Sequence, residues 1–183
     1  MSKLKGFSKK ELIDIYSKIY LSRELDIKQL ILLKQGKGYF HIGASGHEAS
    51  QIAAARNFKP GFDYAYPYYR DQAFCLGWGM QCRDHLLSFL AKEDDPSSGG
   101  RQMPQHFGHL ELNIVSQSSP TGTQFLQAVG AGFALLRNGE HAVVYVSAGE
   151  GTTSQGDFHE ALNWASRDKY PVIFHIQNNH YAI

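Results

Sequence analysis

A carboxylate and a carboxamide follow two apolar runs near the end of this sequence. Glu150 comes after Val143–Val146 and has a glycine on each side, while Asn178 and Asn179 come after Val172–Ile176. Carboxylate and amide oxygens are hard ligands that suit Mg²⁺, an ion that keeps other positions for water and phosphate oxygens. Glycines beside a ligand let the backbone approach it closely. These residue types therefore indicate a magnesium site, provided that the two runs lie side by side.

The elements that would position these residues form one supersecondary unit. The segment between the runs has a helical pattern at about Gly156–Asp168. Two β-rich runs that bracket a helix form a βαβ unit with parallel, adjacent strands. Ligands of open α/β sheets lie outside the carboxyl ends of the strands, which are ~4.8 Å apart. Because the helix N-terminus favours anions at the same place, the sequence predicts a magnesium–diphosphate site.

Two other interpretations compete for this motif. A dinucleotide-binding turn needs G-x-G-x-x-G and an acidic residue at the end of the next strand. Here Gly156 comes too late to be the third glycine, and the second run ends in two asparagines. Those departures argue against a dinucleotide. An ordinary βαβ unit with a glycine turn and an asparagine turn stays open on these residues alone.

The motif resembles the thiamine-diphosphate fingerprint, in which Asn-Asn follows Gly-Asp/Glu-Gly after two to three dozen residues. In this sequence 26 residues separate Gly151 from Asn178. The last six residues resemble the α subunit of 2-oxo acid dehydrogenases, and Glu in the first motif resembles the branched-chain members. The resemblance covers about Ser8–Ile183. It implies thiamine diphosphate and Mg²⁺ as cofactors.

The resemblance also implies which residues hold these cofactors. Mg²⁺ is implied at Glu150, Asn179 and the backbone oxygen of Tyr181, and the cofactor is implied beside Gly149, Glu150 and Gly151.

Three further residues are implied at the diphosphate. Tyr69 and Arg70 resemble the Tyr-Arg pair that binds the terminal phosphate. Arg is a permanent bidentate donor, and a phenol adds one more hydrogen bond. A surface Arg beside a packed Tyr is the alternative. Gln177 stands where branched-chain relatives have a diphosphate-binding Arg, and it offers a hydrogen bond without the charge.

A second loop, Ser-Ser-Pro-Thr-Gly-Thr-Gln, precedes a helix rich in Ala and Gly. A similar loop in branched-chain relatives holds a potassium ion and supports the cofactor. The resemblance implies K⁺ ligands at Ser118, Pro120, Thr123 and Gln124, and it implies that Ser119 and Thr121 face the cofactor. A plain loop that caps the helix is the alternative.

Four histidines leave alternatives open. His41 and His47 flank a Gly-rich segment, and we favour structural or substrate-lining roles over direct chemistry. His106 and His109 stand at positions i and i+3 of a polar loop. No third metal ligand is close to them in the sequence, so an active-site or subunit contact is favoured over a metal site.

The composition of the sequence argues against nucleic acids and membranes as partners. The 183 residues carry a net charge of +1 and are 43% hydrophobic, enough for one domain with a core. The near-neutral charge argues against a nucleic-acid partner. No apolar run approaches the roughly 20 residues that span a bilayer, so no membrane is expected. The lysines of Met1–Gly6 precede no apolar region, and Cys75 and Cys82 have no disulfide spacing, so we expect a cytoplasmic protein.

The expected fold is α/β: a three-layer thiamine-diphosphate-binding fold on the diphosphate side, with a parallel sheet that is incomplete at its C-terminus. Residues 1–36 are expected to form an N-terminal helical arm, which begins with a capping box at Ser8 and Glu11. Residues 37–183 are expected to form the front part of the domain. Because only two strands are clear, we expect the chain to be part of a longer or fused subunit.

The resemblance implies oxidative decarboxylation of a branched-chain 2-oxo acid and acyl transfer to the lipoyl group of an acyltransferase. In this family the Glu that activates the cofactor comes from a β-type subunit, within a heterotetramer. No residue of this chain is therefore expected to be the catalytic acid or base. A pyruvate- or acetoin-type α subunit is the alternative enzyme. An inert fragment with only a subunit-contact role is the alternative from another class.

Overall fold

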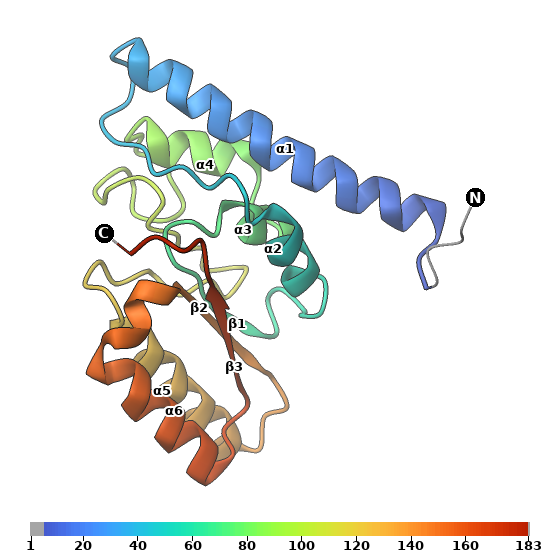
Figure 1. The fold of residues 1–183 in the computed structure, drawn as a ribbon, viewed down its shortest axis with the longest axis vertical. Helices are drawn as coiled ribbons and strands as arrows, with labels where there is room; N and C mark the ends of the chain where they lie inside the picture. Colours follow the sequence, from blue (N-terminus) through green and yellow to red (C-terminus); the bar gives the residue numbers. More distant parts are fainter. Residues whose placement is uncertain (1–5, 183) are drawn as a thin grey trace.

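The computed structural model describes residues 6–182, so residues 1–5 and Ile183 of the expected domains lie outside the described part. Its sheet has three parallel strands in the order β1-β2-β3 (Figure 1). The strands are β1, Tyr64–Tyr66; β2, Val144–Gly149; and β3, Val172–Gln177. Val144 lies opposite Val172, and Gly149 lies opposite Gln177. The prediction that the last two strands are parallel neighbours is confirmed, and both end at one edge of the sheet.

β1 was not predicted from the sequence. It lies in the aromatic segment 63–70, and three paired residues are too few for an alternating pattern to appear. Ala65 pairs with Tyr145 of β2. β1 therefore brings the residues that follow it, including Tyr69 and Arg70, to the same edge where β2 and β3 end.

Six α-helices and one 3₁₀ helix are present in residues 6–182. They are α1, Lys9–Lys34; α2, Glu48–Ala55; α3, Gln72–Trp78; α4, Cys82–Phe89; α5, Thr123–Asn138; η1, Glu150–Ser154; and α6, Gly156–Asp168. The predicted capping box opens α1, since the Glu11 N–H donates to Ser8 Oγ at 3.2 Å and the Ser8 N–H donates to Glu11 Oε2 at 2.7 Å. The helix predicted at 156–168 is confirmed as α6.

Apolar clusters pack on both faces of the sheet, because successive side chains of a strand point to opposite faces. Val144, Val146 and Ala148 of β2 pack against α5 and α6. Tyr145 packs on the other face, where its ring stacks on Phe74 of α3 with centroids 3.9 Å apart. Figure 1 shows α5 and α6 on one side of the strands and α2 and α3 on the other. The expected α/β class with a parallel sheet is confirmed.

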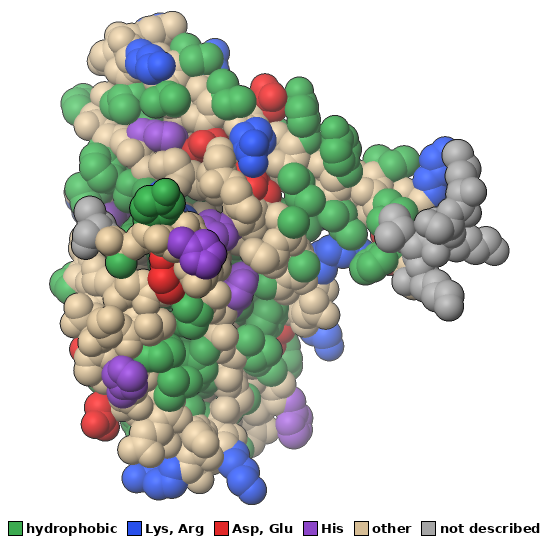
Figure 2. Space-filling view, in the orientation of Figure 1, with side chains coloured by type: hydrophobic (Ala, Val, Ile, Leu, Met, Phe, Trp, Pro, Cys, Tyr) green, Lys and Arg blue, Asp and Glu red, His purple; other side chains and the backbone are tan. Residues whose placement is uncertain are grey.

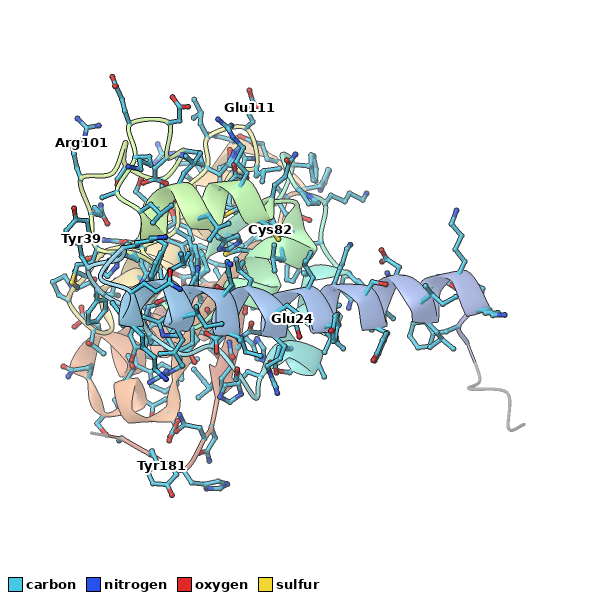
Figure 3. All side chains as sticks on the ribbon, turned by 90° about the horizontal axis from the view of Figure 1, so that it is seen from above. Glu24, Tyr39, Cys82, Arg101, Glu111 and Tyr181 are labelled. Carbon is cyan, nitrogen blue, oxygen red and sulfur yellow. The ribbon has the colours of Figure 1, made fainter. Side chains whose placement is uncertain are left out.

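α1 lies across α2, α3 and α4, and its N-terminal part extends beyond the rest of the molecule (Figures 1 and 3). Leu25 and Gln29 are buried against the body. Ile13, Tyr16 and Tyr20 are exposed on the extending part, and Figure 2 shows hydrophobic side chains along it. None of the helices in residues 6–182 combines the length and the apolar character needed to cross a membrane.

Candidate functional site

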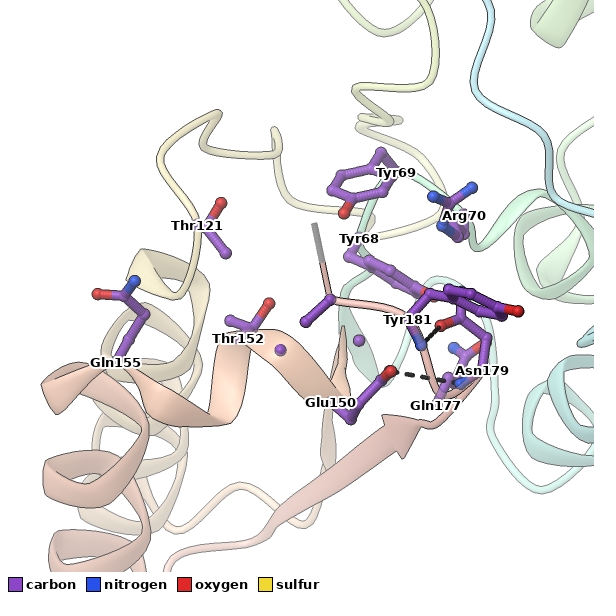
Figure 4. A pocket seen from close by; sticks show the side chains of 13 residues that line it. Tyr68, Tyr69, Arg70, Thr121, Glu150, Thr152, Gln155, Gln177, Asn179 and Tyr181 are labelled. Atoms are coloured by element: carbon purple, nitrogen blue, oxygen red, sulfur yellow. Dashed lines mark hydrogen bonds between the residues drawn. The ribbon is translucent and has the colours of Figure 1, made fainter.

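A pocket opens at the edge where the strands end (Figure 4). Four segments build it: the one after β1, the loop before α5, the turn after β2 and the tail after β3. Its lining residues are Tyr68, Tyr69, Arg70, Thr121, Gly149, Glu150, Gly151, Thr152, Gln155, Gln177, Asn179, Tyr181 and Ala182. The parallel register explains this convergence, because it places the carboxyl ends of neighbouring strands together.

Glu150 begins η1 directly after β2, between two glycines with different surroundings. A Cβ at position 151 would lie 2.7 Å from the Cβ of Ala182, closer than such atoms can approach. A Cβ at position 149 would meet its nearest atom, on the Tyr68 ring, at 3.8 Å. The close approach that requires glycine is therefore made at Gly151, and the atoms that approach belong to the chain's own tail.

The two carboxylate oxygens of Glu150 differ. Oε2 accepts a hydrogen bond from the Asn179 N–H at 3.4 Å, while Oε1 is buried without a hydrogen-bond partner in residues 6–182. Desolvation acts to raise the pKa of this carboxyl, but the nearby backbone N–H groups of Glu150, Asn179 and Tyr181 outweigh it and lower the pKa. The side chain is thus an anion at neutral pH. An occluded, unpartnered anionic oxygen fits the coordination of a cation.

The tail after β3 folds back through two turns between side chains and backbone. Asn178 Oδ1 accepts from the His180 N–H at 2.7 Å, and Asn179 Oδ1 accepts from the Tyr181 N–H at 2.8 Å. The side chain of Tyr181 is 84% exposed and projects from the body (Figure 3).

A carboxylate, a carboxamide and a backbone carbonyl form an oxygen set that fits Mg²⁺. Residues 6–182 contain no cluster of three His, Cys, Asp or Glu side chains that could hold a metal. A metal at this pocket would therefore use the mixed set, with Glu150 as its charged member.

Tyr69 and Arg70 line the side of the pocket opposite Glu150 (Figure 4). Arg70 lies over the Tyr69 ring, 5.4 Å from its centroid, and its Nη1 donates to the Gly43 carbonyl at 2.6 Å. The remaining N–H groups of a guanidinium offer further donors, since Arg has five. The pair therefore supplies a fixed cation with spare donors at the pocket wall.

The loop that holds Gly43 is fastened to α1. Asp26 accepts hydrogen bonds from His41 Nε2 at 3.0 Å, the Ala44 N–H at 3.1 Å and the Ser45 hydroxyl at 2.7 Å. His41 thus anchors the loop in this structure. His47 occupies the N-cap position of α2 without a side-chain cap bond.

The Ser-Ser-Pro loop forms a smaller pocket next to the first. Thr123 Oγ1 lies 2.7 Å from Ser118 Oγ and 3.0 Å from the Pro120 carbonyl oxygen. Gln124 is used internally: its Oε1 accepts from the Gly122 N–H and its Nε2 donates to the Ser147 carbonyl, both at 3.1 Å. Oxygen atoms of three of the four residues predicted to bind K⁺ therefore lie close together, namely those of Ser118, Pro120 and Thr123.

Ser119 and Thr121 of this loop were both predicted to face the cofactor, but they differ in the pockets that they line. Thr121 lines both pockets, whereas Ser119 lines the smaller one. Ser119 Oγ lies 3.1 Å from His106 Nε2, so His106 supports the loop. His109 pairs through its backbone with Ile114.

Gln177 lines the pocket, but its carboxamide is bonded to protein groups. Oε1 accepts from Gln51 Nε2 at 2.8 Å, and Nε2 donates to the carboxylate of Asp71. The residue is only 3% exposed. The resemblance implies a hydrogen bond from Gln177 to a diphosphate, but the sequence gives no sign of Gln51 or Asp71 as partners.

Four lining residues were missed from the sequence: Tyr68, Thr152, Gln155 and Ala182. Tyr68 is almost fully buried, and its place next to Tyr69 is the only signal that could have suggested it. Thr152 and Gln155 follow from the 3₁₀ helix that turns the chain after Glu150, a turn that no sequence pattern indicates.

Known proteins resemble this chain over nearly its whole length. The family model of the dehydrogenase E1 component matches residues 16–183. The α subunit of 2-oxoisovalerate dehydrogenase from Bacillus subtilis is 43% identical over 178 residues, which cover 97% of this chain and 54% of the relative. The mitochondrial α subunit of the same name from Dictyostelium discoideum is 35% identical over 178 residues, or 97% of this chain and 40% of the relative.

A relative with a different name matches at lower identity. The α subunit of the pyruvate dehydrogenase E1 component from Staphylococcus aureus is 34% identical over 173 residues, or 94% of this chain and 44% of the relative. The chain thus spans about half the length of the curated relatives it matches.

Proposed function

This chain belongs to the dehydrogenase E1 component family, and from that premise we propose that it is the α-type subunit of the decarboxylating component of a 2-oxo acid dehydrogenase complex. Its part is to hold Mg²⁺ and thiamine diphosphate during oxidative decarboxylation of a branched-chain 2-oxo acid and acyl transfer to a lipoyl group. The family depends on thiamine diphosphate, which supplies an electron sink for decarboxylation when it is bound.

The observation that supports this proposal most is the buried, unpartnered Oε1 of Glu150. An anionic oxygen without a partner in residues 6–182 has a cost that a bound cation would remove. Glu150, Asn179 and the Tyr181 carbonyl would supply the oxygens for Mg²⁺. Metal bound there would leave positions for water and for the oxygens of a diphosphate.

The remaining pocket residues would bind and orient the diphosphate. Arg70 would donate to a terminal phosphate, with the Tyr69 phenol adding one hydrogen bond. Gly149, Glu150, Gly151 and Thr121 would form the opposite wall, and Ser119 would act from the neighbouring pocket. Ser118, Pro120 and Thr123 would offer oxygens to K⁺, and Gln124 would hold that loop on β2.

Partners complete the reaction in this proposal. A β-type subunit, separate or fused, supplies the Glu that activates the cofactor, within a heterotetramer, and a lipoyl-bearing acyltransferase receives the acyl group. No side chain of this chain is assigned as the catalytic acid or base. Residues 1–36 act as a helical arm on the domain formed by residues 37–183. The proposed location is the cytoplasm.

The substrate class follows from the relatives. The 2-oxoisovalerate relative shares 43% of its aligned residues with this chain, whereas the pyruvate relative shares 34%. Glu rather than Asp at position 150 agrees with the branched-chain members that the motif resembles. A branched-chain 2-oxo acid is therefore the proposed substrate, and pyruvate is the comparison that a substrate assay must include.

Thermal unfolding with thiamine diphosphate, with and without Mg²⁺, tests the proposal. Ligand at about 100 times its Kd adds ~2.7 kcal/mol to the free energy of unfolding, which raises the midpoint by roughly 5–11 °C at this size. We expect the full shift only when both components are present. No shift in the presence of the β-type partner, or an equal shift with plain thiamine, would contradict the proposed site.

A further inference from the structure

A buried polar network lies beneath the pocket, on the face of β2 that packs against α3. Asp71, which is 0% exposed, is at its centre. Asp71 Oδ2 accepts from the hydroxyls of Ser147 and Tyr145 on β2, and Oδ1 accepts from Gln177 Nε2 at the end of β3. Ser147 Oγ also accepts from the Tyr68 N–H at 3.1 Å. Both oxygens of the Asp71 carboxylate are therefore occupied by protein donors.

Gln51 of α2 completes this network. Its Nε2 donates to the Arg70 carbonyl at 3.0 Å and to Gln177 Oε1 at 2.8 Å. Its Oε1 accepts from two N–H groups in the first turn of α3, at 3.1 and 3.3 Å. These four contacts use every donor and acceptor of the carboxamide. They also fix the orientation of Gln177, whose oxygen faces Gln51 and whose nitrogen faces Asp71.

The network joins the two sides of the pocket. Asp71 directly follows Arg70, which lines the cationic side, and Gln177 is two residues before Asn179, which lines the side of Glu150. The hydrogen bond between Asp71 and Gln177 links positions 106 residues apart. This bond thus connects the two groups of pocket-lining residues.

We propose that Asp71 and Gln177 are a positioning pair for this pocket, and that Gln177 acts on ligand binding through Asp71 rather than by contact with the bound anion. The inference rests on the proposed function, because it concerns how the chain fixes the relative positions of its proposed diphosphate-binding and metal-binding groups. Gln177 is buried and its carboxamide has a protein partner at each end. Arg70 remains the residue that contacts phosphate.

An exchange of donor and acceptor tests the pair. In Gln177→Glu, two carboxyl groups face each other and the amide donor to Asp71 is lost. In the double variant D71N/Q177E, the amide introduced at position 71 donates to the carboxylate introduced at position 177, so the bond returns with its direction reversed. The affinity for thiamine diphosphate with excess Mg²⁺ is measured by calorimetric titration of the full chain, with its β-type partner present.

We expect Gln177→Glu to weaken binding about tenfold or more when Asp71 is present, and less than about threefold in the D71N background, because interacting residues are not additive. An equal loss in both backgrounds would overturn the inference, since it would mean that Gln177 meets the ligand independently of Asp71. Wild-type protein that does not bind the cofactor at all would instead overturn the proposed function.

Gln127→Glu is the matched control. Gln127 is exposed on α5 and is not among the residues that line the pocket. It gains the same charge, and we expect its affinity to change by less than about threefold. A loss as large as that of Gln177→Glu would assign the effect to charge alone and overturn the pair.

A second readout needs no ligand. Amide hydrogen exchange is measured at Tyr68 and Tyr181, whose N–H groups are bonded within the network and within the tail. We expect faster exchange at both in Gln177→Glu and recovery in the double variant. If Gln177→Glu does not fold, a folded double variant is the expected rescue. A double variant that also fails to fold would overturn the pair.

Discussion

Two carboxylates lie at the edge where β2 and β3 end, and they differ in how the protein satisfies them. Asp71 is fully buried and accepts three side-chain hydrogen bonds. Glu150 lies in the pocket wall, and one of its oxygens has no partner in residues 6–182. Burial raises the pKa of the Asp71 carboxyl to about 6, against the effect of its hydrogen bonds, whereas backbone N–H groups lower the pKa of Glu150.

This difference in hydrogen bonding distinguishes a structural carboxylate from one that is suited to bind a ligand. A carboxylate whose oxygens are all engaged by donors of the chain holds elements together and has nothing left for a ligand. A carboxylate with an occluded, unpartnered oxygen is suited to bind a cation. Burial and a raised pKa alone would point to Asp71 as the functional residue, because residues with perturbed pKa values are common at functional sites. The hydrogen bonds instead favour Glu150 as the proposed ligand-binding residue.

The largest expected effect comes from Glu150→Ala. Removing the charged member of the oxygen set should weaken Mg²⁺-dependent binding of thiamine diphosphate by about 1000-fold, or roughly 4 kcal/mol. Without ligand, the free energy of unfolding should stay within about 1 kcal/mol of the wild-type value, because only one weak hydrogen bond is lost. Calorimetry and denaturant unfolding measure the two quantities. Unchanged affinity would remove Glu150 from the metal site and end the distinction between the two carboxylates.

Asp71→Ala should lower stability as well as weaken binding. It leaves the buried donors of Ser147, Tyr145 and Gln177 without their acceptor, and we expect the free energy of unfolding to fall by about 2–4 kcal/mol. Denaturant unfolding of the ligand-free protein measures this change. Asp84, at the start of α4, is a control, because its side chain caps an exposed turn and Asp84→Ala should cost about 1 kcal/mol. Equal losses at both positions would show that the network adds no more than a helix cap.

Arg70→Ala tests the cationic side of the pocket. Loss of a charge-assisted hydrogen bond should weaken thiamine diphosphate binding by ~1.5–3 kcal/mol and leave the binding of plain thiamine unchanged. Arg83→Ala is the matched control, since Arg83 is exposed on α4 and pairs only with Asp94 in residues 6–182. Equal effects on thiamine and its diphosphate would mean that Arg70 acts on the shape of the pocket and not on phosphate.

The pH dependence of stability offers the smallest effect. The pKa of Asp71 is raised from 3.8 to about 6 by folding, so the folded protein binds a proton more readily than the unfolded chain between these values. The contribution of Asp71 to the free energy of unfolding therefore falls as pH rises through this window. Relative to Asp71→Asn, wild-type protein should lose about 2 kcal/mol between pH 4.5 and 7. A constant difference would mean that Asp71 keeps its ordinary pKa.

Structure can be predicted from this sequence where it is determined by residues that are close together in the chain. The βαβ unit, the helix at 156–168 and the capping box at Ser8 depend on local patterns, and all three are found. The convergence of Glu150 and Asn179 follows from the same unit. Their roles as ligands of Mg²⁺ stay predictions, as do those of Tyr69 and Arg70 at the diphosphate.

What the sequence could not indicate depends on contacts between distant segments. β1 has three residues, so its pairing is decided by β2 and not by its own pattern. The orientation of Gln177 is set by Gln51 and Asp71, which lie 126 and 106 residues away. An isolated Asp after Tyr-Arg gives no sign that it is buried, because Asp is a residue type that is mostly exposed.

The sequence separation of the residues joined by two hydrogen bonds predicts the order in which parts of the site fold. The bond from Asn179 to Glu150 closes a loop of 29 residues, much of it helix α6, whereas the bond from Gln177 to Asp71 closes one of 106. Loop closure costs more entropy for the longer loop, and contacts between distant residues slow folding. The metal-facing turn should thus assemble early within its own βαβ unit. The segment that contains Arg70 should pack against the end of β3 later. Binding of the diphosphate would therefore require the complete fold.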